Sequence, residues 1–221
     1  ARAYSHSGTP TTYTALGSTS TWVQTPTLGV QPFSGQAANA FTFTFINPGN
    51  PSSTRYLVEL SKASDFLTLV ASSNTTATAV SFSGLASNRL YYAHVAALNQ
   101  FGAATSFTAP AATATLVAAP LPAAVGVSTR TSSVFGGAWT RGTLAVGTNY
   151  RAQASSSPSF AFNVLSSATA NMYASFTGLD SNTTYFIRVQ ALSLNAPTPD
   201  GPFLSAAAGS TLAKTPTPAV T

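Results

Sequence analysis

The sequence predicts an all-β protein in which antiparallel β-sandwiches follow one another in tandem. The chain aligns with itself at an offset of 94 residues, and residues 54–99 and 148–193 are identical at 18 of 46 positions. A repeat of this length is a whole domain, since solenoid repeats span roughly 20 to 50 residues, and it can bury its own core. Short segments that alternate apolar and polar side chains indicate strands with one buried face. The 14 prolines and 15 glycines favour turns between these strands.

The clearest strand of the first repeat covers residues 41–45, where phenylalanine alternates with threonine. Alternation places the three phenylalanines on one face, and the second repeat has Trp139 in the place of Phe45. Three further segments alternate in the same way, with turn signals such as Asn47–Pro51 and Ser87–Asn88 between them. Their predicted buried residues are Tyr56, Val58 and Leu60, then Val80 and Phe82, then Tyr91, Val95 and Ala97. Short strands at this spacing are typical of a sandwich.

Prolines at equivalent positions predict the domain boundaries. Pro26, Pro120 and Pro216 mark three corresponding junctions, the last one displaced by two extra residues within segment 195–209. We therefore expect the C-terminal strands of a preceding repeat in residues 1–25, one sandwich in residues 26–119, a second in residues 120–215 and the start of a further repeat in residues 216–221.

The segment Leu85–Ala97 and its counterpart Leu179–Ala191 resemble fibronectin type III domains. Each has a leucine, a turn, a tyrosine and then alternating valine and alanine residues. The resemblance implies tandem immunoglobulin-like (fibronectin type III) β-sandwiches, in which the tyrosine closes the corner between the fifth and sixth strands and an aromatic residue of the second strand is buried. The residues that define the fold are then Phe45, Trp139, Tyr91, Tyr185, Leu85 and Leu179. Such a fold hosts many functions, so it predicts none by itself.

The composition favours association and excludes several classes of site. Only 6% of the residues are charged, whereas the surfaces of soluble domains usually carry roughly 25 to 35%. The nine cations that give the net charge of +5 are spread along the chain, so we expect no nucleic-acid surface. Cysteine is absent, which excludes disulfides and thiolate sites. No apolar run is long enough to cross a membrane, so we expect no membrane insertion in this segment.

Residues able to carry catalysis or bind a metal are few, and we expect no enzyme, no cofactor and no metal site. Paired carboxylates, triads and metal centres each need several such groups close together. No acid has an acidic counterpart in the other repeat, and strict strand alternation places His94 on the solvent face beside Tyr92 and Ala96. The whole supply of acids and histidines is Glu59, Asp65, Asp180, Asp200, His6 and His94.

Exposed aromatic and apolar residues are the candidates for binding or assembly. Trp22 corresponds to Leu116 and Leu212, just before a junction proline, which favours an interdomain contact over a glycan platform. Tyr92 and its counterpart Phe186 are expected to face outward, toward another subunit or a sugar. The complete set of candidates is Tyr13, Leu16, Trp22, Tyr92 and Phe186.

Residues 1–24 leave three alternatives open. They correspond to the end of a sixth strand and a whole seventh strand, while the five strands that should pair with them do not lie in this chain. Unpaired apolar strand edges are unfavourable, because their backbone groups and apolar face need a partner. Either the missing strands lie upstream in one continuous array, or the segment completes a sandwich of another subunit by strand addition. The third alternative is a disordered or self-docked tail.

These observations favour a structural segment of an extracellular or cell-surface filament, stalk or adhesin built from serial fibronectin type III-like domains. Abundant alanine, serine and threonine without cysteine indicate a repeat protein of bacterial type. The expected partners are copies of the chain itself, with a cell-surface glycan as a second candidate. The alternatives are a spacer or glycan-binding accessory segment of a large secreted enzyme, and a module that binds a protein through its loops. The complete reading frame distinguishes a filament from an enzyme.

Overall fold

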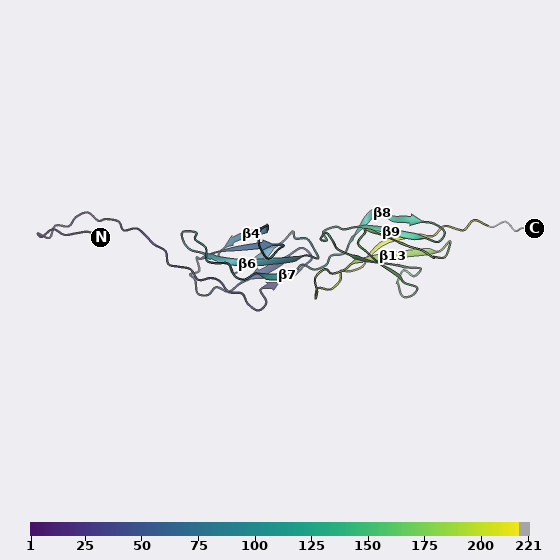
Figure 1. The fold of residues 1–221 in the computed structure, drawn as a ribbon, viewed down its shortest axis with the longest axis horizontal. Helices are drawn as coiled ribbons and strands as arrows, with labels where there is room; N and C mark the ends of the chain where they lie inside the picture. Colours follow the sequence, from purple (N-terminus) through teal and green to yellow (C-terminus); the bar gives the residue numbers. More distant parts are fainter. Residues whose placement is uncertain (217–221) are drawn as a thin grey trace, which may run out of the picture.

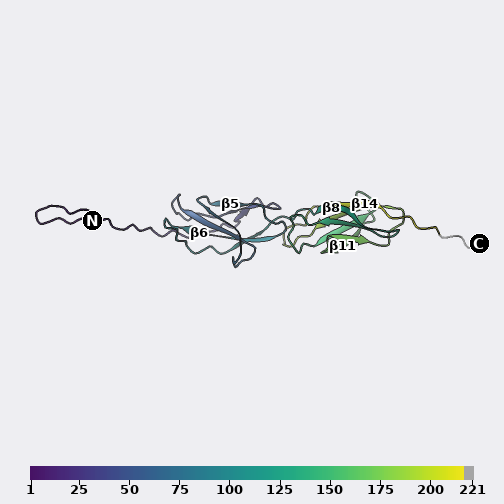
Figure 2. The same ribbon diagram turned by 90° about the horizontal axis from the view of Figure 1, so that it is seen from above.

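The computed structural model of the chain describes residues 1–216, with all of their side chains except those at positions 124, 125 and 206. Two sandwiches lie one after the other along the long axis, and the N-terminal segment and the last described residues, up to position 216, extend in opposite directions (Figures 1 and 2). None of the described segments is a helix long and apolar enough to cross a membrane. The repeat expected to start at residues 216–221 lies, from residue 217 on, outside the described part.

The first sandwich consists of two antiparallel sheets with the strand orders β1-β2-β5 and β4-β3-β6-β7. The alternating phenylalanines at positions 41, 43 and 45 are buried between these sheets, and the ring of Phe45 lies edge-on to Tyr56, 4.9 Å away between centroids. The strands are β1 (Phe33–Ser34), β2 (Phe41–Thr44), β3 (Arg55–Ser61), β4 (Leu69–Thr75), β5 (Ala79–Phe82), β6 (Leu90–Leu98) and β7 (Ala111–Ala114).

The second sandwich repeats this plan strand for strand, with the orders β12-β9-β8 and β11-β10-β13-β14. Trp139 takes the place of Phe45 and lies edge-on to Tyr150. Burial raises the pKa of Tyr150, and the positive charge of Arg141 acts in the opposite direction. The strands are β8 (Leu121–Arg130), β9 (Phe135–Thr140), β10 (Tyr150–Ser155), β11 (Leu165–Thr169), β12 (Tyr173–Phe176), β13 (Thr184–Ala191) and β14 (Leu204–Ser210).

The sequence prediction of an all-β fold of tandem immunoglobulin-like sandwiches is confirmed. The hydroxyl of Tyr91 accepts a hydrogen bond from the backbone N–H of Ala86, and that of Tyr185 accepts one from Asp180. Each tyrosine therefore ties the corner before its strand to the core. The six residues expected to define the fold are all buried: Phe45, Trp139, Tyr91, Tyr185, Leu85 and Leu179. The boundaries proposed at the junction prolines stay predictions.

Candidate functional site: the joint between the sandwiches

The two sandwiches meet at the turn between β5 and β6, where Asn88 is inserted into the second sandwich. Its φ of 58° is left-handed, a conformation that asparagine adopts more readily than most residues. The side-chain Nδ2 donates hydrogen bonds to Thr148 Oγ1 (3.2 Å) and to the carbonyl of Leu192 (2.9 Å), and Oδ1 accepts one from the backbone N–H of Leu194 (2.8 Å). The whole carboxamide is satisfied across the joint, and Asn88 is only 1% exposed.

The backbone of the same turn adds a short β-ladder. The N–H of Ser87 donates to the carbonyl of Thr143 (3.0 Å), and the carbonyl of Ser87 accepts from the N–H of Ala145 (2.9 Å). Ser87 and Leu144 thus form a parallel β-bridge between the two sandwiches, and Leu144 and Ala145 are buried beneath it. Together with the Asn88 contacts, five hydrogen bonds cross the joint. They fix the relative orientation of the two sandwiches as well as the distance between them.

Thr115, just after β7, holds this turn in shape from within the first sandwich. Its hydroxyl donates to the carbonyl of Ala86 (2.8 Å) and accepts from the N–H of Arg89 (3.1 Å), and the residue is fully buried. The corner of the second sandwich has the same seal, because the hydroxyl of Thr211 bonds Asp180 and Thr183 in the same way. The corner is therefore part of the repeating plan of each sandwich.

The corner of the second sandwich carries Asn182 in the position of Asn88. Its φ of 52° is nearly the same, and its N–H donates to the carbonyl of Leu212 at 3.2 Å, as that of Asn88 does to Leu116. However, Asn182 is exposed, and within residues 1–216 its carboxamide makes no hydrogen bond. The same turn thus bonds to a neighbouring sandwich at the joint, whereas at the corner of the second sandwich it bonds to no neighbouring sandwich within residues 1–216.

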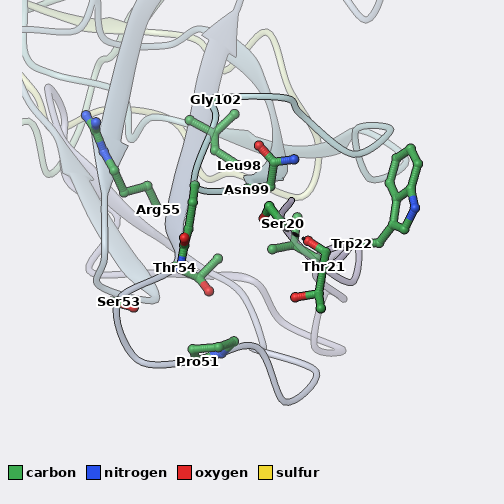
Figure 3. Close-up of a pocket in the computed structure, with 12 residues that line it drawn as sticks. Ser20, Thr21, Trp22, Pro51, Ser53, Thr54, Arg55, Leu98, Asn99 and Gly102 are labelled. Carbon is green, nitrogen blue, oxygen red and sulfur yellow. Dashed lines mark hydrogen bonds between the residues drawn. The ribbon is translucent and has the colours of Figure 1, made fainter. Parts of the chain in front are cut away.

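The opposite end of the first sandwich holds the counterpart of the surface that receives Asn88. A hollow of about 170 Å³ is lined there by Thr54, Leu98 and Gln100, together with the entering segment 20–23 (Figure 3). At the offset of 94 residues, these three positions match Thr148, Leu192 and Leu194. Each end of the two-sandwich unit therefore presents one half of the joint.

The structure places the assembly candidates of the N-terminal segment in a tail. Residues 1–14 fold back on themselves locally through bonds such as Thr11 N–H to the carbonyl of Ala3 (2.8 Å), and the tail extends away from the sandwich (Figure 1). Tyr13 and Leu16 are exposed there. Trp22 lies at the rim of the hollow with its ring directed away from the other lining residues (Figure 3), and it is 92% exposed. Their roles in assembly stay predictions.

The two strand candidates lie on separate sandwiches. Tyr92 is in β6 and Phe186 in β13, and both are half-buried. Phe186 lines a shallow apolar hollow together with Phe160 and Ala208. The structure does not bring Tyr92 and Phe186 together with the tail residues into one site.

The expectation that His94 is exposed is wrong, because His94 is 8% exposed. Its ring is stacked between Phe66 and Phe107, at 3.5 and 3.8 Å between centroids, and its Nε2 lies 2.8 Å from Oε2 of Glu59. Strand alternation does direct His94 to the outer face of the sheet. That face is covered because the chain before β7 still bonds to β6, through Thr108 N–H to the carbonyl of Val95 (2.9 Å), and thereby carries Phe107 over it.

Arg188 occupies the same covered position in the second sandwich. Its guanidinium carbon lies 4.2 Å from the ring centre of Phe160 and 4.1 Å from that of Phe203, and its Nε donates to Oε1 of Gln153 (2.8 Å). A flat nitrogen-bearing group between two rings, anchored to the neighbouring strand, is therefore a repeated packing feature. The recurrence favours a structural role for His94.

The remaining acids are dispersed and serve local contacts. Asp65 accepts from the N–H of Leu67 in a turn, and Asp200 bonds the N–H of Ser193 and lies 3.5 Å from Arg151. Asp180 is in the corner beside Asn182, and His6 lies exposed in the tail. In the described part of the chain, no three histidine, aspartate or glutamate side chains gather as a metal site would need.

Sequence reasoning marked Ser87–Asn88 as a turn and missed Asn88 as the residue that connects the sandwiches. One signal was present, since Asn88 and Asn182 are identical within the repeat. The sequence does not show which of two identical corners has a neighbour against it.

Comparison with known proteins supports the fold. Neither a protein-family model nor a curated protein matches the chain. A solved two-domain fibronectin type III segment of chicken tenascin superposes with a TM-score of 0.56 at 14% identity, over 85% of this chain and all of the other. The FN1–FN3 domains of chicken CNTN1 align with a TM-score of 0.37 at 16% identity, over 96% of this chain and 76% of the other. The tenascin superposition, together with the strand orders of the two sandwiches, shows that the chain has the fold of tandem fibronectin type III-like sandwiches.

Proposed function

We propose that this chain is a structural segment of an extracellular or cell-surface filament, stalk or adhesin, in which serial sandwiches are held at a fixed orientation. The observation that carries the proposal is the joint formed by Asn88. Domains in one chain move relative to each other by default unless an interface restrains them. Here a turn of one sandwich is built into the next, as a stiff element requires.

The surface composition supports the same role. With 6% charged residues, the chain has little like-charge repulsion to keep copies apart. Among residues 1–216, one ion pair between an arginine or lysine and an acid is found, and it links Arg151 with Asp200. Copies of the chain are therefore the partners that we propose first. A spacer in a secreted enzyme would use the same stiff joint, and only a catalytic domain elsewhere in its reading frame distinguishes it.

Residues 17–24 support assembly by strand addition as part of this proposal. Thr21 corresponds to Thr115 and Thr211, which seal the corners of the two sandwiches, yet Thr21 itself is exposed. The segment therefore carries the sequence of a closing strand with nothing in the described chain to close. The partner that fits is a sandwich that lacks its own last strand. Such a sandwich lies either upstream in the array or in another subunit.

Pulsed electron spin resonance tests the stiffness of the joint. The chain has no cysteine, so labels attach only at introduced sites, and Ser83→Cys with Thr177→Cys uses two exposed, equivalent positions. We expect one narrow distance distribution, which broadens when Asn88→Ala is added. A broad distribution in the protein with native Asn88 would contradict the proposed function.

A further inference from the structure

We propose that the corner of Asn182 in one copy docks into the hollow of Thr54, Leu98 and Gln100 in a second copy, so that copies join end to end. The proposal deepens the proposed function and rests on it, because it takes the internal joint as the template for contacts between molecules. Its occupant is a second copy of this chain, and its geometry is that of Asn88 in the second sandwich.

The donor half is already in its docked shape. Asn182 and Asn88 have φ values of 52° and 58°, and both corners are sealed by a buried threonine, Thr211 or Thr115. No rearrangement is needed to present the carboxamide, so little conformational entropy is lost when it binds. The exposed carboxamide of Asn182 is therefore free to make the contacts that Asn88 makes.

The receptor half holds polar groups that match. The hydroxyl of Thr54 and the backbone N–H of Gln100 have no hydrogen-bond partner in residues 1–216, and their counterparts Thr148 and Leu194 bond the side chain of Asn88. The local turn is also the same, since the N–H of Thr54 donates to the carbonyl of Pro51 (2.9 Å). Docking gives each of these groups a partner.

The template predicts which bonds form. Asn182 Nδ2 donates to Thr54 Oγ1 and to the carbonyl of Leu98, Oδ1 accepts from the N–H of Gln100, and the N–H of Ser181 donates to the carbonyl of Gly49. One bond of the internal joint has no equivalent, because Pro51 replaces Ala145 and has no N–H to donate. The contact between copies is therefore weaker than the internal joint.

The chain segments of the two copies that meet at the hollow must separate when the copies dock. Residues 212–216 of the donor correspond to residues 22–26 of the receptor and would follow the same route. In the receptor, Gln24 is held by two hydrogen bonds to the side chain of Asn50, whereas residues 212–216 are exposed, so the donor segment is the one that can turn aside at low cost. Because the donor corner belongs to the second sandwich and the receptor hollow to the first, the contact is heterologous. Repetition then gives an open chain of molecules instead of a closed dimer.

Sedimentation over a range of concentrations tests the docking. Asn182-Thr183-Thr184 matches the N-glycosylation pattern, so the protein is made in a host without this modification. We expect the average mass to rise with concentration, and Asn182→Ala and Thr54→Val each to lower the association constant about tenfold. If the two residues contact each other, the double variant loses no more than the larger single loss. Asn171→Ala, which removes an exposed carboxamide elsewhere, should associate like the unchanged protein.

The outcomes separate this proposal from the proposed function. A protein that stays monomeric up to about millimolar concentration, or association that Asn182→Ala leaves unchanged, overturns the docking. Neither result affects the spin-label test of the internal joint. Circular dichroism and thermal unfolding of each variant confirm that a lost association does not reflect a lost fold.

Discussion

Asn88 and Asn182 occupy the same turn of their sandwiches, yet Asn88 is almost fully buried and Asn182 is exposed. Backbone angle, sealing threonine and the hydrogen bond of the N–H are the same at both corners. The difference between them therefore comes from the neighbour and not from the corner. Each sandwich builds a finished docking turn by itself, and a stiff array results wherever a following sandwich presents the matching end.

The two cores place a bulky side chain on opposite sheets at equivalent positions. In the first sandwich, the bulky Phe43 of β2 and the small Ala93 of β6 belong to the same buried cluster. At the equivalent positions of the second sandwich, Gly137 of β9 lies against Ile187 of β13. A Cβ placed on Gly137 would lie 3.1 Å from Cδ1 of Ile187 and 3.2 Å from Ala207. The bulky side chain that fills this part of the core thus comes from the sheet of β2 in the first sandwich. In the second sandwich it comes from the other sheet, that of β13.

The largest expected effect on stability comes from giving the first core the small and large residues that the second core has at the equivalent positions. Phe43→Ala should destabilise the first sandwich by about 3–5 kcal/mol, since it opens a cavity. Adding Ala93→Ile should recover part of this loss, whereas Ala93→Ile alone should cost about 1–3 kcal/mol by overpacking. Denaturant unfolding followed by NMR measures the first sandwich, and the fluorescence of buried Trp139 serves as an internal control. Additive losses would contradict the comparison of the cores.

Asn88→Ala should reduce the mutual stabilisation of the sandwiches by about 2–4 kcal/mol. Three hydrogen bonds are lost, and alanine is strained at a left-handed φ. Asn182→Ala is the matched control, because it carries the same strain of about 1 kcal/mol without a joint to lose. Unfolding of both variants in denaturant gives the difference. Equal losses at the two corners would mean that the joint contributes nothing.

The sealing threonines should behave alike, in contrast to the asparagines. Thr115→Val and Thr211→Val each leave a carbonyl and an N–H of the corner without their side-chain partner, at a cost of about 1–3 kcal/mol. Each variant should mainly affect its own sandwich, which NMR resolves by the amide signals of the two halves. A much larger effect of Thr115→Val would show that the corner depends on its neighbour for its shape.

The smallest expected effect is at Ser87, whose hydroxyl is buried in the joint without a hydrogen-bond partner in the described chain. Ser87→Ala removes an unsatisfied polar group, so stability should stay the same or rise by up to about 1 kcal/mol. Ser181→Ala, at the open corner, should have no effect. A loss of stability in Ser87→Ala would reveal a contact of this hydroxyl that the structure does not show.

Much of the fold could be predicted from the sequence, because it depends on local patterns. Alternation identified the buried phenylalanines of β2, and the repeat identified equivalent corners around Tyr91 and Tyr185. His94 shows the limit: its strand phase was correct, but its burial depends on the loop that carries Phe107, and loop paths are not encoded by alternation. The joint was missed for the same reason, since contacts between sandwiches leave no periodic pattern in either one.

The central claim, that Asn88 fixes the orientation of the two sandwiches, is tested most directly by residual dipolar couplings measured on both of them. Two rigidly joined bodies share one alignment tensor, whereas two mobile bodies have different ones. We expect a single tensor for the unchanged protein and for Asn182→Ala, and two distinct tensors for Asn88→Ala. Two tensors in the unchanged protein would contradict the account.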